Sequence, residues 1–225
     1  MNHRFATLSR TLAPLALVLA ALGVPGAANA ADGAITIKDK TLVTDMAGYR
    51  VTMPLPDWND GRSGADALAE ANVARKAKPG AELVEIFPPG SSADGWTQRY
   101  AAFASVHANA RGEHILNTVS SFRQVCEPDA LSFQTTPAAN PQLQEITLVV
   151  CGHFVDGVVG AAFQGKGEVM LVVVPGDATA AVKVSHEWLG PAFSIGDPGT
   201  WPVSEKVLTA RGLALQSMTR LEKLK

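Results

Sequence analysis

The most regular patterns along the chain are those of β-strands. Over residues 143–154 the positions alternate between two faces, one of which carries Cys151 and His153. Residues 168–174 are apolar without alternation, which is typical of a strand buried on both faces. The same reasoning predicts a hairpin over 34–54 and strands over 81–87 and 182–188. The last of these alternates apolar and polar positions, so we expect one of its faces to meet solvent.

Helical periodicity predicts four helices between and after these strands. Ser63 and Asp66 have the spacing of a capping box, which favours a short helix over the Ala-rich stretch 65–77. Three further sets of residues recur at intervals of three or four and so share one face of a helix. These sets are Trp96, Tyr100, Phe103 and His107; Ile115, Val119, Phe122 and Cys126; and Val203, Val207, Ala210, Ala214, Met218 and Leu221.

The order of these elements predicts the fold class. A sheet with a strand buried on both faces needs helices or long loops on two sides. No internal repeat or linker marks a second domain. We therefore predict a single α+β domain over residues 31–225, in which helices pack on a mostly antiparallel sheet.

The first 30 residues have the features of a signal peptide. A positively charged start is followed by an apolar run over 12–24 and by Ala28-Asn29-Ala30, the small residues that signal peptidase requires. The run is shorter than the ~20 apolar residues that cross a bilayer. We predict cleavage after Ala30, export to the periplasm or beyond, and no membrane span after cleavage.

Composition and charge exclude some partners. The chain has 19 Lys and Arg against 21 Asp and Glu, and 47% of its residues are hydrophobic, as in globular proteins. Removing Arg4 and Arg10 with the signal peptide leaves 17 basic against 21 acidic residues, a net charge of −4. A mildly acidic surface repels phosphates, so we exclude nucleic acid as a partner.

Export also decides how the two cysteines are interpreted. In an oxidising compartment an isolated pair most often forms a disulfide. Cys126 and Cys151 have only each other as partners, and no CxxC spacing suggests a redox centre. We therefore predict a Cys126–Cys151 bridge that ties the predicted helix ending at Cys126 to the strand over 143–154, with the Cys151 face of that strand toward the helix.

Several residues could carry chemistry, but none forms a complete motif. The stretch 160–167 fits a phosphate-binding loop until Gly167, which stands where Ser or Thr would hold Mg²⁺, so we expect no nucleotide cofactor. No serine lies in a Gly-x-Ser-x-Gly elbow. We predict no catalytic residue, metal ligand or cofactor. The alternative is a periplasmic hydrolase or metal-binding protein that uses His114 and His153, with Glu113 as a conceivable third group.

The tryptophans suggest a binding role. Trp58, Trp188 and Trp201 lie in or beside Pro- and Gly-rich loops, where a large ring either plugs the core or forms an exposed binding surface. Export, the bridge and the lack of a convergent set of polar residues favour a non-catalytic binding or assembly protein of the cell envelope. Its partner would be an envelope protein or a small ligand.

Short motifs between about residues 80 and 190 resemble those of small exported bacterial proteins of unassigned function. These motifs are the strand Leu83-Val84-Glu85-Ile86-Phe87 before Pro88-Pro89-Gly90, the Trp96-Thr97-Gln98 that would open a helix, Cys151-Gly152, and Gly167-Glu168. The resemblance implies an αβα sandwich like that of the Mog1/PsbP group, whose members mostly bind or assemble with proteins. It implies structural roles for Trp96 and the cysteines and no catalytic residue.

Overall fold

The computed structural model describes residues 35–225 except 59–60, 108, 141, 144 and 178, so the predicted signal peptide lies outside the described residues. Its strands form two antiparallel sheets. The larger has the order β4 (Asn72–Lys78), β5 (Ala81–Phe87), β6 (Gln98–Val106), β10 (Ala180–Pro191), β9 (Lys166–Val173), β8 (Glu145–Cys151) and β7 (Leu131–Pro137). The smaller has the order β1 (Thr36–Lys38), β2 (Thr41–Met46), β3 (Tyr49–Pro54) and β11 (Arg220–Lys223).

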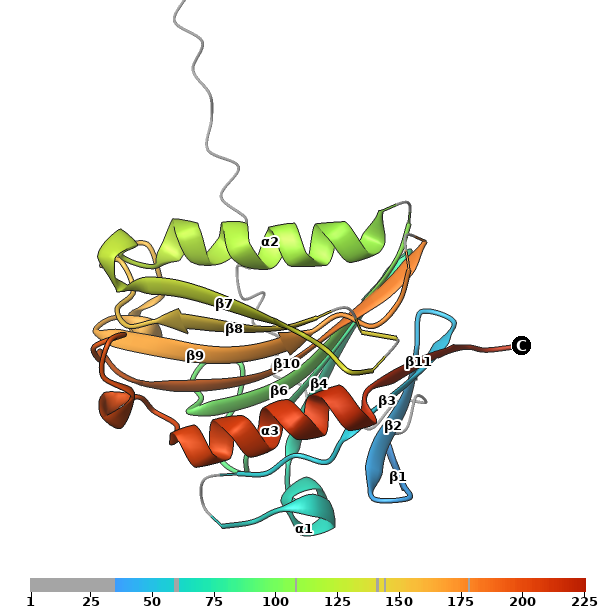
Figure 1. Ribbon diagram of the computed structural model, residues 1–225. Coiled ribbons are helices and arrows are strands. Elements are labelled where there is room, and N and C mark those ends of the chain that lie inside the picture. Colours follow the sequence, from blue (N-terminus) through green and yellow to red (C-terminus); the bar gives the residue numbers. More distant parts are fainter. Residues whose placement is uncertain (1–34, 59–60, 108, 141, 144, 178) are drawn as a thin grey trace, which may run out of the picture.

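The helices and the small sheet cover the two faces of the large sheet (Figure 1). Helix α2 (Ala110–Val125) lies on one face, and helix α3 (Glu205–Met218) lies on the other beside the small sheet. The short α1 (Gly64–Ala69) and three single 3₁₀ turns, η1 (Pro128–Ala130), η2 (Ala161–Phe163) and η3 (Pro198–Thr200), complete the described elements. None of the described helices is long and apolar enough to cross a membrane. The predicted α+β class is confirmed.

Alternation along the central strands builds two hydrophobic cores. On β8, Val149 and Cys151 pack with Phe122 of α2, whereas Ile146 and Val150 pack with Leu215 of α3. All seven central residues of β9 from Gly167 to Val173 are buried, as expected for a strand covered on both faces. The predicted strands over 81–87, 143–154 and 168–174 and the N-terminal hairpin are thus confirmed.

The helix predicted from Trp96 to His107 is wrong. The segment forms β6, which pairs with β5 on one side and β10 on the other. Its residues alternate between faces: Tyr100 and Ala102 join the core below α3, and Phe103 faces the ring of His114 on α2. Hydrogen bonds to two neighbouring strands outweigh the helical propensity of its alanines.

Three further predictions need correction. The Ala-rich helix ends at Ala69, and β4 follows because its backbone pairs with β5. The polar face of β10, expected to meet solvent, is buried. Ser185 and Glu187 lie on the face of the sheet that α2 covers and are 0% and 1% exposed. The C-terminal helix exists, and of the predicted stripe Val203 is buried and Val207 and Leu221 pack against the core. Ala210 and Met218 are exposed, whereas Arg211, Gly212 and Leu215 are buried, and the chain then enters β11.

The predicted disulfide is confirmed. Cys126, directly after α2, is bonded to Cys151 at the end of β8, with their Cα atoms 5.8 Å apart. Both residues are buried beside Phe122 and Val149. The bridge therefore fixes one end of α2 on the face of β8 that the sequence pattern assigned to it.

Candidate functional site

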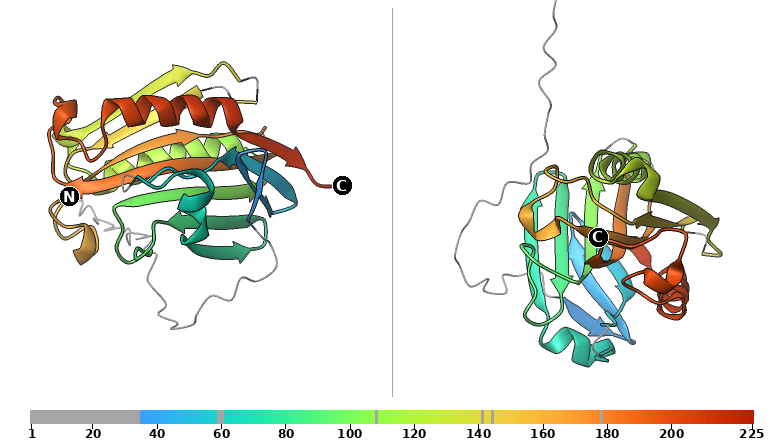
Figure 2. Two further views of the ribbon diagram at one scale, coloured as in Figure 1. Left: turned by 90° about the horizontal axis from the view of Figure 1, so that it is seen from below. Right: turned by 90° about the vertical axis from the view of Figure 1, so that its left-hand side faces the viewer.

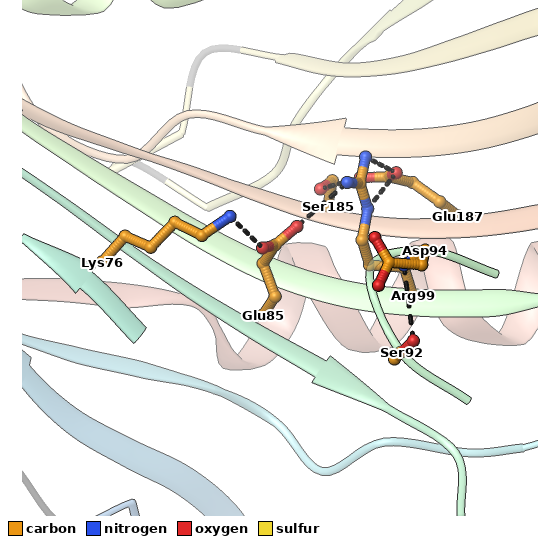
Figure 3. Close-up of polar contacts among 7 residues, drawn as sticks. All are labelled: Lys76, Glu85, Ser92, Asp94, Arg99, Ser185 and Glu187. Carbon is orange, nitrogen blue, oxygen red and sulfur yellow. Dashed lines mark hydrogen bonds and ion pairs between the residues drawn. The ribbon is translucent and has the colours of Figure 1, made fainter. Parts of the chain in front are cut away.

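An ionic cluster lies across four neighbouring strands on the α2 side of the large sheet (Figure 3). Arg99 of β6 donates from Nε to Glu187 Oε2 of β10 at 2.7 Å and from Nη1 to Glu85 Oε1 of β5 at 3.0 Å. Lys76 of β4 lies 3.8 Å from Glu85, and the hydroxyl of Ser185 donates to Glu187 at 2.6 Å. The strand register brings these residues together, because Arg99 is directly opposite Glu187 on the neighbouring strand.

The surroundings of this cluster keep its charges balanced. The ring of Trp96 stacks 4.9 Å from the Arg99 guanidinium. Burial and the negative charge of Glu187 hold the pKa of nearby Glu168 well above its usual range, which favours the protonated carboxyl. Burial lowers the pKa of Lys183. Because Ser185 and Glu187 are closed off from solvent, we assign the cluster to stabilising the sheet rather than to acting on a substrate.

A second polar network lies on the opposite face, under α3. His186 Nδ1 accepts a hydrogen bond from Arg211 Nε at 3.1 Å, and Arg211 Nη1 donates to the carbonyl of Leu55 at 2.9 Å. The His186 ring stacks on Trp188, with 4.0 Å between centroids. Burial and the charge of Arg211 hold the pKa of His186 well below its usual range, so the imidazole is neutral. This network joins α3 to the sheet and to the segment after β3.

Two of the three tryptophans predicted for a binding surface are in the core. Trp58 is 2% exposed and donates from Nε1 to the carbonyl of Ala67, and Trp188 is 0% exposed under the His186 ring. Trp201 is half-buried, with its Nε1 donating to the carbonyl of Ser194. Trp58 and Trp188 plug the core, because their rings fill the space between the two sheets and α1. An exposed surface built from these two rings is therefore excluded.

The two histidines of the metal or hydrolase alternative lie in different surroundings. His114 is on the buried face of α2, and its ring lies edge-on to that of Phe103, with 5.2 Å between the ring centroids. His153 is partly buried just after the disulfide, where its carbonyl accepts a hydrogen bond from the Glu127 amide. Among the described residues, no three His, Cys, Asp or Glu side chains are placed to hold a metal ion.

His114 predicts how stability depends on acid. Burial and the charge of Lys183 lower its pKa to about 4, whereas an exposed histidine has a value of ~6.5. As the pH falls from about 6.5 to about 4, His114 is protonated in the unfolded chain but stays neutral in the folded chain. The free energy of unfolding should therefore fall by up to about 3 kcal/mol. Denaturant titrations at several pH values should show a shallower fall for His114→Gln than for the parent. An equally steep fall in His114→Gln would contradict this assignment.

The two outer strands of the large sheet differ in charge. At one margin β4 carries Arg75, Lys76 and Lys78, the kind of charged residues that protect an edge strand against pairing with another chain. At the other margin β7 has the sequence Leu-Ser-Phe-Gln-Thr-Thr-Pro, with no charge, and its last four residues are exposed. The right-hand view of Figure 2 shows β7, in olive, at the outer margin of the sheet. Its one protecting feature is the terminal Pro137, which has no amide hydrogen to donate.

The hydrogen-bond pattern shows which backbone groups of β7 face outward. The Gly152 amide donates to the carbonyl of Ala130 at 2.7 Å, just before β7 begins. Since bonding alternates along an antiparallel pair, the even-numbered residues of β7 bond to β8 and the odd-numbered ones face away from it. The N–H and C=O groups of Leu131, Phe133 and Thr135 are therefore oriented toward whatever lies beyond the sheet.

Hollows flank β7 on both faces of the sheet. On the α2 side, Phe133 and Thr135 line a cavity of about 60 Å³ with Ile115 and Val119. On the α3 side, Gln134 and Thr136 line an open groove of about 240 Å³. The remaining wall of the groove comes from Ile146, Leu148, Leu171, Leu208, Thr209, Gly212, Leu213 and Gln216. The side chains of an added strand, which alternate between faces, would meet one hollow and then the other.

Of the features predicted or found, the β7 margin is the one that presents backbone donors, acceptors and adjacent hollows at the surface. The Glu85, Ser185 and Glu187 side chains of the ionic cluster and the His186 network are buried and support the fold. Sequence reasoning missed the β7 margin, although the alternation of Leu131, Phe133 and Thr135 with polar residues before Pro137 is a usable strand signal. No protein-family model matches the sequence, and no curated protein matches it significantly.

Proposed function

We propose that this chain is an exported cell-envelope protein with a non-catalytic binding or assembly role, and that it binds an extended segment as an additional strand on β7. The observation that carries the proposal is an uncharged edge strand whose outward backbone groups lie between two hollows. In strand addition, the backbone hydrogen bonds provide affinity, and pockets for alternate side chains provide specificity. The β7 margin has both parts.

Export is supported by two independent features. The first 30 residues carry the charged start, apolar run and Ala-Asn-Ala sequence of a cleaved signal peptide. The Cys126–Cys151 bridge is buried, and such bridges form and persist in oxidising compartments such as the periplasm. The proposed location is therefore the periplasm or the cell exterior.

The αβα sandwich of the Mog1/PsbP group remains part of this proposal. It is supported by α2 and α3, which pack on opposite faces of the antiparallel large sheet. Trp96 does not open a helix as the resemblance implied, since β6 follows it. Members of that group mostly bind or assemble with proteins, which agrees with a role for the β7 margin.

Site-specific photo-cross-linking in intact cells tests the proposal. The full chain is expressed with p-benzoylphenylalanine in place of Gln134, which is exposed in the middle of β7. Irradiation is expected to give a discrete cross-linked adduct, because an added strand would pass within reach of this side chain. The matched control places the same residue at Lys78, exposed on the charged edge β4, and is expected to give none. Equal adduct at the two positions, or none at either, would refute a docking role for β7.

A further inference from the structure

We propose that the segment that binds β7 is the β7 strand of a second copy of this chain. This inference rests on the function proposed above and names its partner. In the proposed dimer the two β7 strands pair antiparallel about a two-fold axis that passes beside Gln134, so that the large sheets of both copies become continuous. Three features of β7 support this dimer: the register of its outward backbone groups, the compatibility of the side chains that would pair, and its lack of charged residues.

The outward backbone groups of β7 are complementary to those of an antiparallel copy of the same strand. They are the N–H and C=O groups of Leu131, Phe133 and Thr135 and the C=O group of Pro137. Each donor of one strand can therefore lie opposite an acceptor of the other along the full strand. Phe133 of each copy would exchange two hydrogen bonds with Thr135 of the other. Leu131 of each copy would donate one to the carbonyl of Pro137 of the other, which needs no amide hydrogen on the proline.

The side chains brought together by this register are compatible. On the α2 side, Phe133 would lie opposite Thr135, an aromatic and β-branched pair of the kind that stabilises antiparallel sheets. On the α3 side, Gln134 would face its own copy, and their amides can bond to each other. Ser132 would lie opposite Thr136, a pair of hydroxyl side chains, and Leu131 would lie opposite Pro137, an apolar pair. No like charges meet anywhere along the pair.

The same pairing is unfavourable for the opposite margin. If a second copy of the chain paired its own β4 with this β4, Arg75, Lys76 and Lys78 would lie beside a second set of cations. Pairing with any other strand would leave these three side chains partly desolvated. Association through β7 alone uses the same patch on both copies and therefore closes as a dimer. Growth of a fibre through successive sheet edges is blocked by the charges on β4.

The helices beside β7 can enlarge the interface. A pair of seven-residue strands is small for a stable protein–protein interface, so contacts around it are needed. On the α3 side, Leu213 is 63% exposed and lines the groove next to Gln134 and Thr136. The two-fold axis brings the matching groove of the second copy to the same side of the sheet. The exposed leucines would then be covered, which accounts for a large apolar side chain at this margin.

Analytical ultracentrifugation of the purified mature protein tests the proposal with two variants. The parent is expected to show a monomer–dimer equilibrium that shifts with concentration. Thr135→Pro removes an outward amide hydrogen without removing a bond to β8, and Gln134→Lys places two positive charges on the axis. Each is expected to weaken dimerisation by at least about tenfold, whereas Lys78→Glu on β4 is expected to leave it unchanged. Circular dichroism and thermal unfolding would show whether each variant is folded.

Cysteine cross-linking provides the second readout. Under mild oxidation Gln134→Cys is expected to form an intermolecular disulfide, because residue 134 would lie opposite itself, while Thr136→Cys, opposite Ser132, is expected to form much less. A parent that stays monomeric up to about 100 µM, or a dimer that both β7 variants leave intact, would overturn the proposal. If the protein is monomeric and position 134 still cross-links to a different envelope protein, strand addition stands and the second copy is excluded. If position 134 gives no adduct, both proposals fail.

Discussion

Replacing Arg99 with methionine is expected to lower the free energy of unfolding by about 3 kcal/mol at neutral pH. Arg99 contacts Glu187 and Glu85, whose side chains are 1% and 6% exposed. Without the guanidinium, two carboxylates would remain buried, and the nearby cations would be Lys76, which is mostly exposed and lies beside Glu85, and Lys183. We take the lower end of the range for broken buried ion pairs because water reaches Arg99, which is 29% exposed.

The matched control for this variant is Arg50→Met. Arg50 forms a two-pronged ion pair with Asp45 on β2, but the two side chains are 47% and 42% exposed. Removing such a surface pair should cost less than about 1 kcal/mol. Urea titrations at pH 7 would compare the variants with the parent. Equal costs for the two variants would contradict the role assigned to the ionic cluster.

Removing the disulfide is the second change with a large expected effect. The bridge joins residues separated by 25 positions. In the chain-entropy model, opening a loop of this size costs about 3 kcal/mol. The double variant Cys126→Ala, Cys151→Ala should therefore unfold at a clearly lower denaturant concentration than the oxidised parent. The loss of stability should be greatest in α2, because Cys126 anchors the C-terminal end of this helix to β8.

Reduction of the parent is the control for this prediction. Both cysteines are buried, at 2% and 0% exposure, so a thiol reductant without denaturant should leave the bridge intact. With denaturant present, the reduced parent should match the double variant. An unchanged unfolding midpoint in the double variant would show that the bridge adds no stability to this fold.

The reliability of the sequence predictions followed the strength of the local pattern. The continuous apolar run of β9 and the alternation of β8 identify strands by themselves, and the lone pair of cysteines identifies the bridge. Over 96–107, four large side chains fit a helical face, but Ala101, Ala102 and Ala104 leave the local preference weak. Pairing of β6 with two distant strands then decides the structure.

The sites could not be predicted because their members come from distant parts of the chain. Arg99 and Glu187 are 88 positions apart and meet through strand register, which a single sequence does not specify. Arg211 is not among the residues of the predicted C-terminal stripe, yet it is buried in the structure, four residues before the fully buried Leu215 on the same face of α3. The β7 margin depends on the order of strands in the sheet, since a strand becomes an edge only through its place in that order.

Amide hydrogen exchange along β7 tests most directly whether this strand accepts another. It would be measured residue by residue in the free mature protein, diluted until it is monomeric, and in the adduct isolated after cross-linking at position 134. The N–H groups of Ser132 and Gln134 face β8 and should be protected in both states. Strand addition predicts that the outward N–H groups of Phe133 and Thr135 exchange freely in the free protein and become protected in the adduct. Free exchange at Phe133 and Thr135 in both states would contradict it.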